Sequence, residues 1–329
     1  MNASTIGAQS TRAGVLLGVW YDLAIIAQQI FQLLIVIGTL ENITALIILY
    51  LLRKKDLIAP IPWVILSHQL LIDSLGATMT LIVSFNVPNE GQHFPVFFNF
   101  LLCQAWDSGA IFSLFFLESD YNHILFAVMI YLSIRFPIYY FTMKKQIVLI
   151  LLVFHAVCII INAPMFTRLT FSTLTFECIE PWIYKAQSYN IYQLYASLKV
   201  VTDFFVPFIF LITFNFMIVR VLRSKSSKLQ IQGTNVGYHG PEVRAEATAA
   251  LLRISIAFIF SFILCSVYIT LFEFFVGTKI WNLTYDAVEA NLAVLSESVS
   301  LLIDPIFIVM FLPAFRRQVA RLWPTSHKI

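Results

Sequence analysis

Seven carboxylates lie within long apolar stretches of this sequence, and they are the residues best placed to do chemistry. They are Glu41, Asp73, Glu118, Asp120, Asp203, Glu297 and Asp304. A charged side chain at the centre of a bilayer costs about 2.5–3.5 kcal/mol on insertion scales, so such groups are functional candidates. We expect each to bind a cation, to pair with a base such as His123, or to carry a proton. The alternative is a hydrogen-bonded polar core that only holds helices together.

Helical spacing sorts these groups, because residues four apart lie on one face of a helix. Glu118 therefore shares a face with Asn122, and Ser119 shares one with His123. For Glu118 and Asp120, a structural or lumen-facing role is the simpler interpretation.

Lys199 and Asp203 are also four residues apart. The simpler interpretation is an ion pair within one helix. The sharper interpretation is that both side chains face a ligand cavity. The spacing alone leaves both open.

The elements that must hold these residues are membrane-spanning helices. Of the 329 residues, 59% are hydrophobic and 12% are charged, about half the charged share of a soluble domain. Apolar runs of roughly 20 residues can cross a bilayer, and seven such runs predict an all-α bundle of seven transmembrane helices. The runs are 23–52, 60–85, 97–134, 146–167, 195–222, 248–276 and 287–312.

The distribution of Lys and Arg predicts the orientation of the bundle. Cytoplasmic loops of membrane proteins carry the excess of basic residues. With the N-terminus outside, all but five of the 21 basic residues fall on the cytoplasmic side. The five are Arg12, Arg168, Lys185, Lys199 and Lys279. We therefore expect an extracellular N-terminus over 1–22, a seven-helix domain over 23–312 and a cytoplasmic segment over 313–329.

This orientation makes two predictions about covalent chemistry. The sequons at Asn2 and Asn282 fall outside the cell, where glycosylation occurs, whereas the sequon at Asn42 lies within the first helix. Cys103 and Cys178 also fall outside, in an oxidising compartment. We expect a disulfide between them; the alternative is two free thiols.

Several motifs resemble those of rhodopsin-like (class A) G-protein-coupled receptors. Leu71-Ile-Asp73-Ser-Leu matches a buried aspartate of the second helix in that family. Phe204-Phe-Val-Pro207 matches a Phe-x-x-Pro pattern of the fifth, and Asp304-Pro305-Ile-Phe-Ile308 stands for Asn/Asp-Pro-x-x-Tyr of the seventh. Pro137–Lys145 resembles the second inner loop, and Phe315–Arg317 resembles the start of a short amphipathic eighth helix. The motifs are weak singly, but their order and depth make the resemblance strong.

Some of the family's switch residues are replaced. Met129-Ile130-Tyr131 stands where the family has Asp-Arg-Tyr, so the arginine that engages the G protein is missing. Ser266 takes the place of a tryptophan and Ile308 that of a tyrosine. The chain thus resembles a divergent member, and an invertebrate orphan or chemosensory receptor is one candidate type. Without the charged lock, we expect a weakly restrained resting state.

The resemblance implies a mid-bundle polar cluster, a ligand site and a partner. The cluster comprises Asn42, Asp73, Ser119, Ser300 and Asp304, with Na⁺ as an optional occupant at Asp73 and Asp304. The implied residues of an extracellular ligand site are Phe112, Ser113, Phe116, Lys199, Asp203, Ser266, Ile269, Glu273 and Glu297. The implied location is the plasma membrane, in contact with lipid, and the implied partner is a heterotrimeric G protein.

Other functions have weaker support. The sequence has no Gly-rich phosphate loop, no Cys/His metal spacing and no nucleophile elbow, so we expect neither an enzyme nor a resident cofactor. The basic residues follow from topology, and nothing indicates nucleic-acid binding. The rival class is an ion- or proton-coupled transporter or channel that uses the intramembrane carboxylates. The runs show no pair of matching halves, which speaks against that class.

Overall fold

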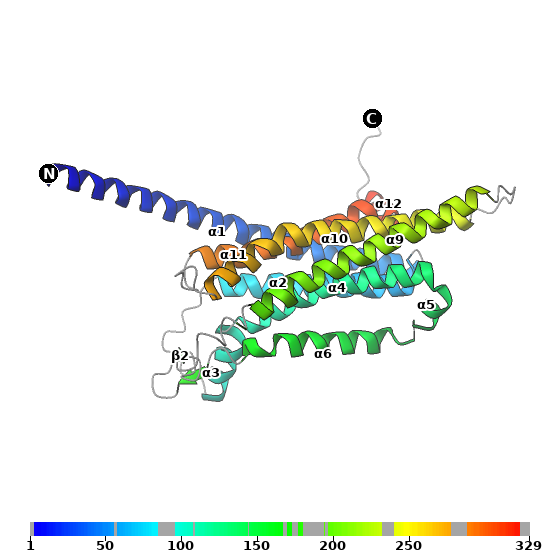
Figure 1. The fold of residues 1–329 in the computed structure, drawn as a ribbon, viewed down its shortest axis with the longest axis horizontal. Coiled ribbons are helices and arrows are strands. Elements are labelled where there is room, and N and C mark those ends of the chain that lie inside the picture. The colour runs from blue at the N-terminus through cyan, green and yellow to red at the C-terminus, as the bar shows by residue number, and fades with distance from the viewer. Residues whose placement is uncertain are drawn as a thin grey trace.

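The computed structural model describes most of the chain, and nearly all of the described residues are helical (Figure 1). The described backbone covers residues 3–55, 58–84, 96–107, 109–143, 145–166, 170–172, 177–179, 194, 197–231, 240–277 and 288–322. Within it, the side chains of 3–25, 225–231, 241–247, 288–298 and some scattered residues lie outside the description.

Three of the long helices match the predicted runs closely, whereas α1 is longer than predicted. α2 (Pro60–Ser84), α6 (Ile147–Phe166) and α11 (Val288–Phe311) begin and end within a residue or two of expectation. α1 (Ala3–Lys54) begins 20 residues before the predicted run, and its N-terminal part projects beyond the other helices in Figure 1. The separate N-terminal segment expected over 1–22 is therefore helical from Ala3 onward.

The third predicted run is broken rather than continuous. It comprises α3 (Val96–Leu102), the π-helix η1 (Cys103–Asp107) and α4 (Ala110–Arg135). Gly109, at the start of α4, has φ of 74°, and a Cβ there would lie 2.6 Å from the Phe112 ring. Glycine adopts this left-handed conformation without strain, so it allows the chain to turn between η1 and α4.

The last third of the chain is more helical than the sequence indicates. η2 (Val201–Phe205) is a π-helical turn that leads into α9 (Val206–Ile231), and α10 covers Gly240–Gly277. Much of the stretch between the predicted runs 195–222 and 248–276 is therefore helix. Two short helices, α5 (Pro137–Met143) and α12 (Pro313–Leu322), lie near one end of the bundle (Figure 1).

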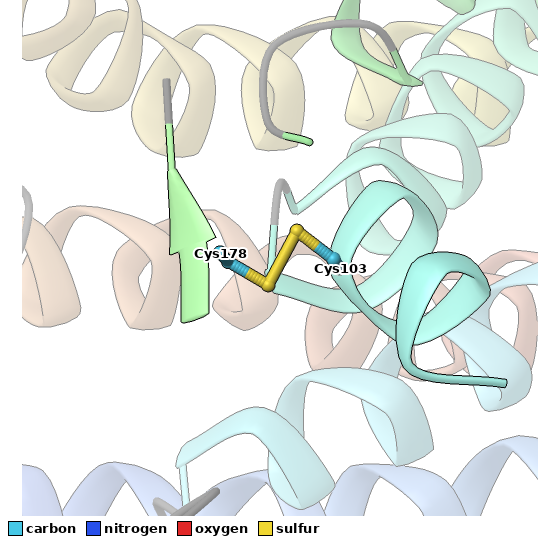
Figure 2. Close-up of a disulfide and its surroundings, with 2 residues drawn as sticks. All are labelled: Cys103 and Cys178. Carbon is cyan, nitrogen blue, oxygen red and sulfur yellow. A yellow bond between two sulfur atoms is a disulfide. The ribbon is translucent and has the colours of Figure 1, made fainter. Parts of the chain in front are cut away.

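At the opposite end of the bundle, a disulfide joins a short β-hairpin to η1. β1 (Thr170–Ser172) and β2 (Glu177–Ile179) pair antiparallel, with Phe171 opposite Cys178. Figure 2 shows Cys178 on β2 bonded to Cys103 at the start of η1. The Cα atoms are 5.6 Å apart, within the usual range. The predicted pairing is confirmed. We call this the disulfide end, and the opposite end the α5 end.

Six helical stretches of the described part are long and apolar enough to cross a membrane. They are Gln32–Lys54, Pro60–Ile82, Asn99–Arg135, Ile147–Phe166, Ser197–Ser224 and Thr248–Val267. In α11 the apolar stretch found among the described residues is shorter, Leu302–Phe311. The chain thus has the helices of a multi-pass membrane protein.

α4 lies at the centre of the packing. It contacts α2, α6, α9 and α10, while α1 packs against α2 and α11. A Cβ on Gly38 would lie 2.6 Å from Leu302 Cγ, so a glycine is needed where α1 and α11 approach. At the α5 end, α1, α2, α4, α9, α10, α11 and α12 share one apolar core, which includes Leu52, Ile65, Ile130, Ile254 and Phe315.

Candidate functional site

Two buried carboxylates meet in the middle of the bundle. Asp73 on α2 and Asp304 on α11 both have no exposed surface. The amide Nε2 of Gln69 donates to Asp73 Oδ1 at 2.8 Å and to Asp304 Oδ2 at 3.4 Å, and it lies 2.6 Å from Ser119 Oγ. The Ser119 hydroxyl also donates to Asp73 Oδ1 at 2.8 Å. One glutamine thus joins groups from three helices.

His123 completes this cluster on the side of α10. Its Nε2 lies 2.8 Å from Asp304 Oδ2, and its ring stacks on Phe258 with the centroids 4.2 Å apart. His123 is 1% exposed. The expected pairing of an intramembrane carboxylate with His123 is therefore present, and the partner is Asp304.

Three polar atoms of this cluster are buried without a hydrogen-bond partner. They are Asp73 Oδ2, Asp304 Oδ1 and His123 Nδ1. Buried polar atoms are nearly always satisfied, so each exception requires an explanation. Carboxylate oxygens are the ligands that a hard cation such as Na⁺ prefers, and a buried carboxylate can instead carry a proton. No group of three or more His, Cys, Asp or Glu in the described ranges is arranged to hold a metal ion.

The other two members expected in the cluster are also buried. Asn42 is fully buried on α1, and its Nδ2 donates to the Gly38 carbonyl at 2.9 Å. Ser300 is 7% exposed on α11.

A second polar group extends from this cluster towards α6. Asn122 Nδ2 donates to Gln69 Oε1 at 2.6 Å, and Asn122 Oδ1 lies 3.1 Å from His68 Nδ1. His68 Nε2 lies 3.0 Å from His155 Nε2, and His155 Nδ1 lies 2.8 Å from Glu118 Oε1. A continuous hydrogen-bonded chain thus runs from the carboxylates to the α4–α6 interface.

Among the predicted ligand-site residues whose side chains the structure describes, Phe112, Ser113, Phe116 and Ser266 pack within the bundle. The Phe112 and Phe116 rings meet edge to face, and they pack with Ile35 on α1 and Ala77 on α2. Ser113 and Ser266 are buried, at 8% and 3% exposure. The side chains of Ile269, Glu273 and Glu297 lie outside the described residues, as do both predicted glycosylation sites, Asn2 and Asn282.

Lys199 and Asp203 lie at a small cavity instead. Lys199 Nζ is 3.9 Å from Asp203 Oδ2, the ion pair expected from their spacing. The cavity has a volume of about 180 Å³ and lies between α4, α6 and η2. Its lining is Leu117, Ile160, Ile161, Asn162, Pro164, Leu198, Lys199, Thr202 and Asp203. Both interpretations of this pair are compatible, because the paired side chains also face a cavity.

Met129-Ile130-Tyr131, the triplet that the resemblance sets against Asp-Arg-Tyr, lies in the apolar core at the α5 end. Met129 and Ile130 are 4% and 3% exposed and pack in one core with Ile218 and Ile254. Tyr131 packs against the same core. Apolar packing therefore surrounds this triplet and joins α4 to its neighbours at the α5 end.

Sequence reasoning missed Gln69 and underrated His68, although both gave a signal. Gln69 lies four residues before Asp73 in the same apolar run, so the sequence predicts a polar face on α2. His68 and His155 are ionisable residues within predicted spans, which makes them functional candidates by default. The sequence does not predict the contact between the His68 and His155 rings, because this contact depends on how α2 and α6 are rotated about their axes.

Comparison with protein-family models and with curated proteins gives no match to this chain.

Proposed function

We propose that this chain is a seven-helix plasma-membrane receptor, with an extracellular N-terminus, that signals through a heterotrimeric G protein. The observation that carries the proposal is the buried cluster of Asp73, Ser119, Asp304 and His123, which joins α2, α4 and α11 through directional bonds. A change in its protonation or cation occupancy would favour one relative position of these helices, and ligand binding elsewhere could bias the same equilibrium.

In this proposal α11 is the seventh span and α12 is an eighth helix on the inner leaflet. α11 has the length of a span, 24 residues, although only part of its apolar character falls on described side chains. In α12, Phe315 is 1% exposed and packs into the core, while Arg316 and Arg317 are exposed. An apolar face next to a basic face suits a helix that lies at a membrane surface.

The cavity between α4, α6 and η2 is the best-supported place for the ligand. It combines apolar walls with one ammonium and one carboxylate, the mixture typical of small-molecule sites. The π-helical turn η2 places Thr202 and Asp203 at the cavity, and such turns are frequent at functional sites. A small ligand with both a hydrogen-bond donor and an acceptor suits this pair.

A G-protein activation screen over a ligand library, in cells that express the chain, tests the proposal. We expect an activating ligand whose potency falls in Lys199→Met and in Asp203→Asn. Asp73→Asn should alter the efficacy of that ligand and leave surface expression near wild type. Glu41→Gln, a carboxylate change on α1 outside the cluster, is the matched control. Surface-expressed protein that activates no G protein under any ligand would contradict the proposal.

A proton-coupled transporter is the second candidate function. The hydrogen-bonded chain from Glu118 to Asp304 favours it, because linked ionisable groups within a membrane are typical of proton relays. Voltage-clamp recording separates the two candidates. A current that depends on the expressed chain and on Glu118 would favour transport, whereas ligand responses without current favour the receptor.

A further inference from the structure

Three short contacts connect α2, α4 and α6 at a site that the proposed receptor function does not use. They join Asn122 to His68 at 3.1 Å, His68 to His155 at 3.0 Å and His155 to Glu118 at 2.8 Å. Glu118 has a side chain that is 7% exposed, and that of His155 is 35% exposed. At such distances each contact is a hydrogen bond and contains one proton.

The direction of the first contact is fixed by groups that can only accept. Asn122 Nδ2 lies 3.3 Å from the backbone carbonyl of Ile65 and 2.6 Å from Gln69 Oε1. Gln69 in turn directs its Nε2 at the Asp73 and Asp304 carboxylates. Asn122 therefore presents its Oδ1, an acceptor, to His68. It follows that His68 Nδ1 carries a proton.

Two neutral histidines carry too few protons to complete all three hydrogen bonds. A neutral imidazole carries one proton and offers one acceptor nitrogen. If His68 is neutral, its proton is on Nδ1 and its Nε2 is an acceptor, so His155 Nε2 must donate. If His155 is also neutral, its Nδ1 is then an acceptor facing Glu118 Oε1, and only a protonated Glu118 can complete that contact. Every arrangement that completes all three contacts holds three protons.

We propose that Glu118, His155 and His68 form a proton-binding site that holds one proton more than two neutral imidazoles and a carboxylate. The extra proton resides on the carboxyl group or on one of the two rings, and in each case the three side chains together have zero net charge. A neutral unit suits an apolar environment, in which an unpaired charge is costly. Loss of the proton leaves two lone pairs facing each other across one contact, so one of the three contacts that join α2, α4 and α6 is lost.

The ionisable groups around this site come from every element packed against it. Cys158 on α6 lies near Glu118 and Asp203, and Tyr121 lies near Asp203, Cys158 and Asp120. Asp203 is paired with Lys199. Through Asn122 and Gln69, the site also connects to the carboxylate cluster. The remaining intramembrane groups on neighbouring described elements are Glu41, Asp73, His123 and Asp304.

The proposal predicts how stability depends on pH. Above about pH 7 an unfolded chain holds one proton on each histidine and none on Glu118, given ordinary values near 6.5 and 4.3. The folded chain would hold one proton more. Stability then falls as pH rises wherever the folded state binds the extra proton, and the folding equilibrium constant decreases about tenfold per pH unit.

Glu118→Gln tests this directly, because an amide can replace the extra proton. The amide introduced by this substitution can donate its N–H to His155 Nδ1, so two neutral histidines then complete all three contacts. We expect the purified full-length variant to fold, and its stability to lack the alkaline decrease that the wild type shows between pH 7 and 9. Glu41→Gln should keep the wild-type profile. Equal alkaline slopes in wild type and Glu118→Gln would overturn the proposal.

A spectroscopic measurement decides the question even if Glu118→Gln does not fold. At pH 8 the folded wild type, labelled at histidine nitrogens and glutamate carbons, should show either one imidazolium by nitrogen NMR or one protonated carboxyl by infrared spectroscopy. His155→Gln should remove that signal, because a glutamine amide can donate to both Glu118 and His68. A wild-type sample that shows neither species at pH 8 would rule out the extra proton.

Discussion

The polar middle of the bundle and the apolar core at the α5 end join many of the same helices by different means. In the middle, Gln69, Ser119 and His123 connect α2, α4 and α11 through contacts of 2.6–3.4 Å. At the α5 end, Ile65, Ile130 and Ile308 on those same three helices are buried in one apolar cluster.

This difference determines which substitutions each region can tolerate. A hydrogen-bonded group depends on its partner, so removal of one member leaves the other buried and unsatisfied. Apolar packing has no such pairs, and its loss is graded by the volume removed. We therefore expect the middle to respond to the identity and protonation of single residues, and the α5 end to respond to size alone.

The largest expected effect is at His123 and Asp304. His123→Leu leaves the Asp304 carboxylate buried without its base and should lower the free energy of unfolding by about 3–5 kcal/mol. The double variant with Asp304→Leu should recover much of this loss, because both polar partners are then gone. Unfolding of the purified protein in detergent measures both. Losses that add up in the double variant would show that the pair acts as two independent residues.

In the apolar core, Ile254 provides the matched comparison. Ile254 has no exposed surface, so Ile254→Ala should cost about 2–5 kcal/mol and Ile254→Val about 0.5–1.5 kcal/mol. The same unfolding measurement applies, and the loss should be equal at pH 6 and pH 8. A pH-dependent loss would show that the two regions are not independent.

The disulfide should rank next. Cys103→Ser and Cys178→Ser should each cost about 2–4 kcal/mol of stability, because the bond restricts the unfolded chain. Each should also reduce the amount of protein at the cell surface. The double variant should be no worse than either single variant. Peptide mapping that found both thiols free in folded wild-type protein would contradict the pairing.

Tyr140 should give the smallest effect. Burial against the apolar core raises the pKa of Tyr140 to about 12, above the ordinary value of 10. The neutral phenol is favoured in the folded state, so this contribution is complete below pH 10 and is lost as the pH rises from 10 to 12. Tyr140→Phe should leave stability at pH 7 nearly unchanged and should remove one late-titrating tyrosine from the absorbance titration. An unchanged titration would place the late transition elsewhere.

The sequence predicted the helices better than the contacts between them. Runs of apolar residues depend on composition along the chain, so α2, α6 and α11 were found within a residue or two. The Cys103–Cys178 bond followed from compartment and depth. The contact between His68 and His155 depends on the rotation of two helices about their axes, which a hydropathy pattern does not encode.

The predicted ligand site shows the same limit. Phe112 and Phe116 were grouped with Lys199 and Asp203 by the resemblance and by helical phase. In the structure the two phenylalanines pack towards α1 and α2, while the ion pair faces α4 and α6. Nor does the sequence show which apolar residues meet in one core, as Met129 and Ile130 do with Ile218 and Ile254.

The sparse burial of α6 has a consequence for how the protein assembles in a membrane. Its apolar side chains are mostly exposed, including Val148, Leu152 and Ile160, and lipid tails solvate such residues as well as a protein interior does. The hydrophobic effect therefore contributes little free energy to the packing of α6 against the other helices. Hydrogen bonds favour this packing instead. His155 contacts Glu118 and His68, and Asn162 donates to the Ala110 carbonyl at 2.7 Å. After insertion, α6 would therefore pack against the bundle only once its polar partners are in place. Whenever they are not in place, α6 would remain in the lipid, where the cell's quality-control machinery could recognise it.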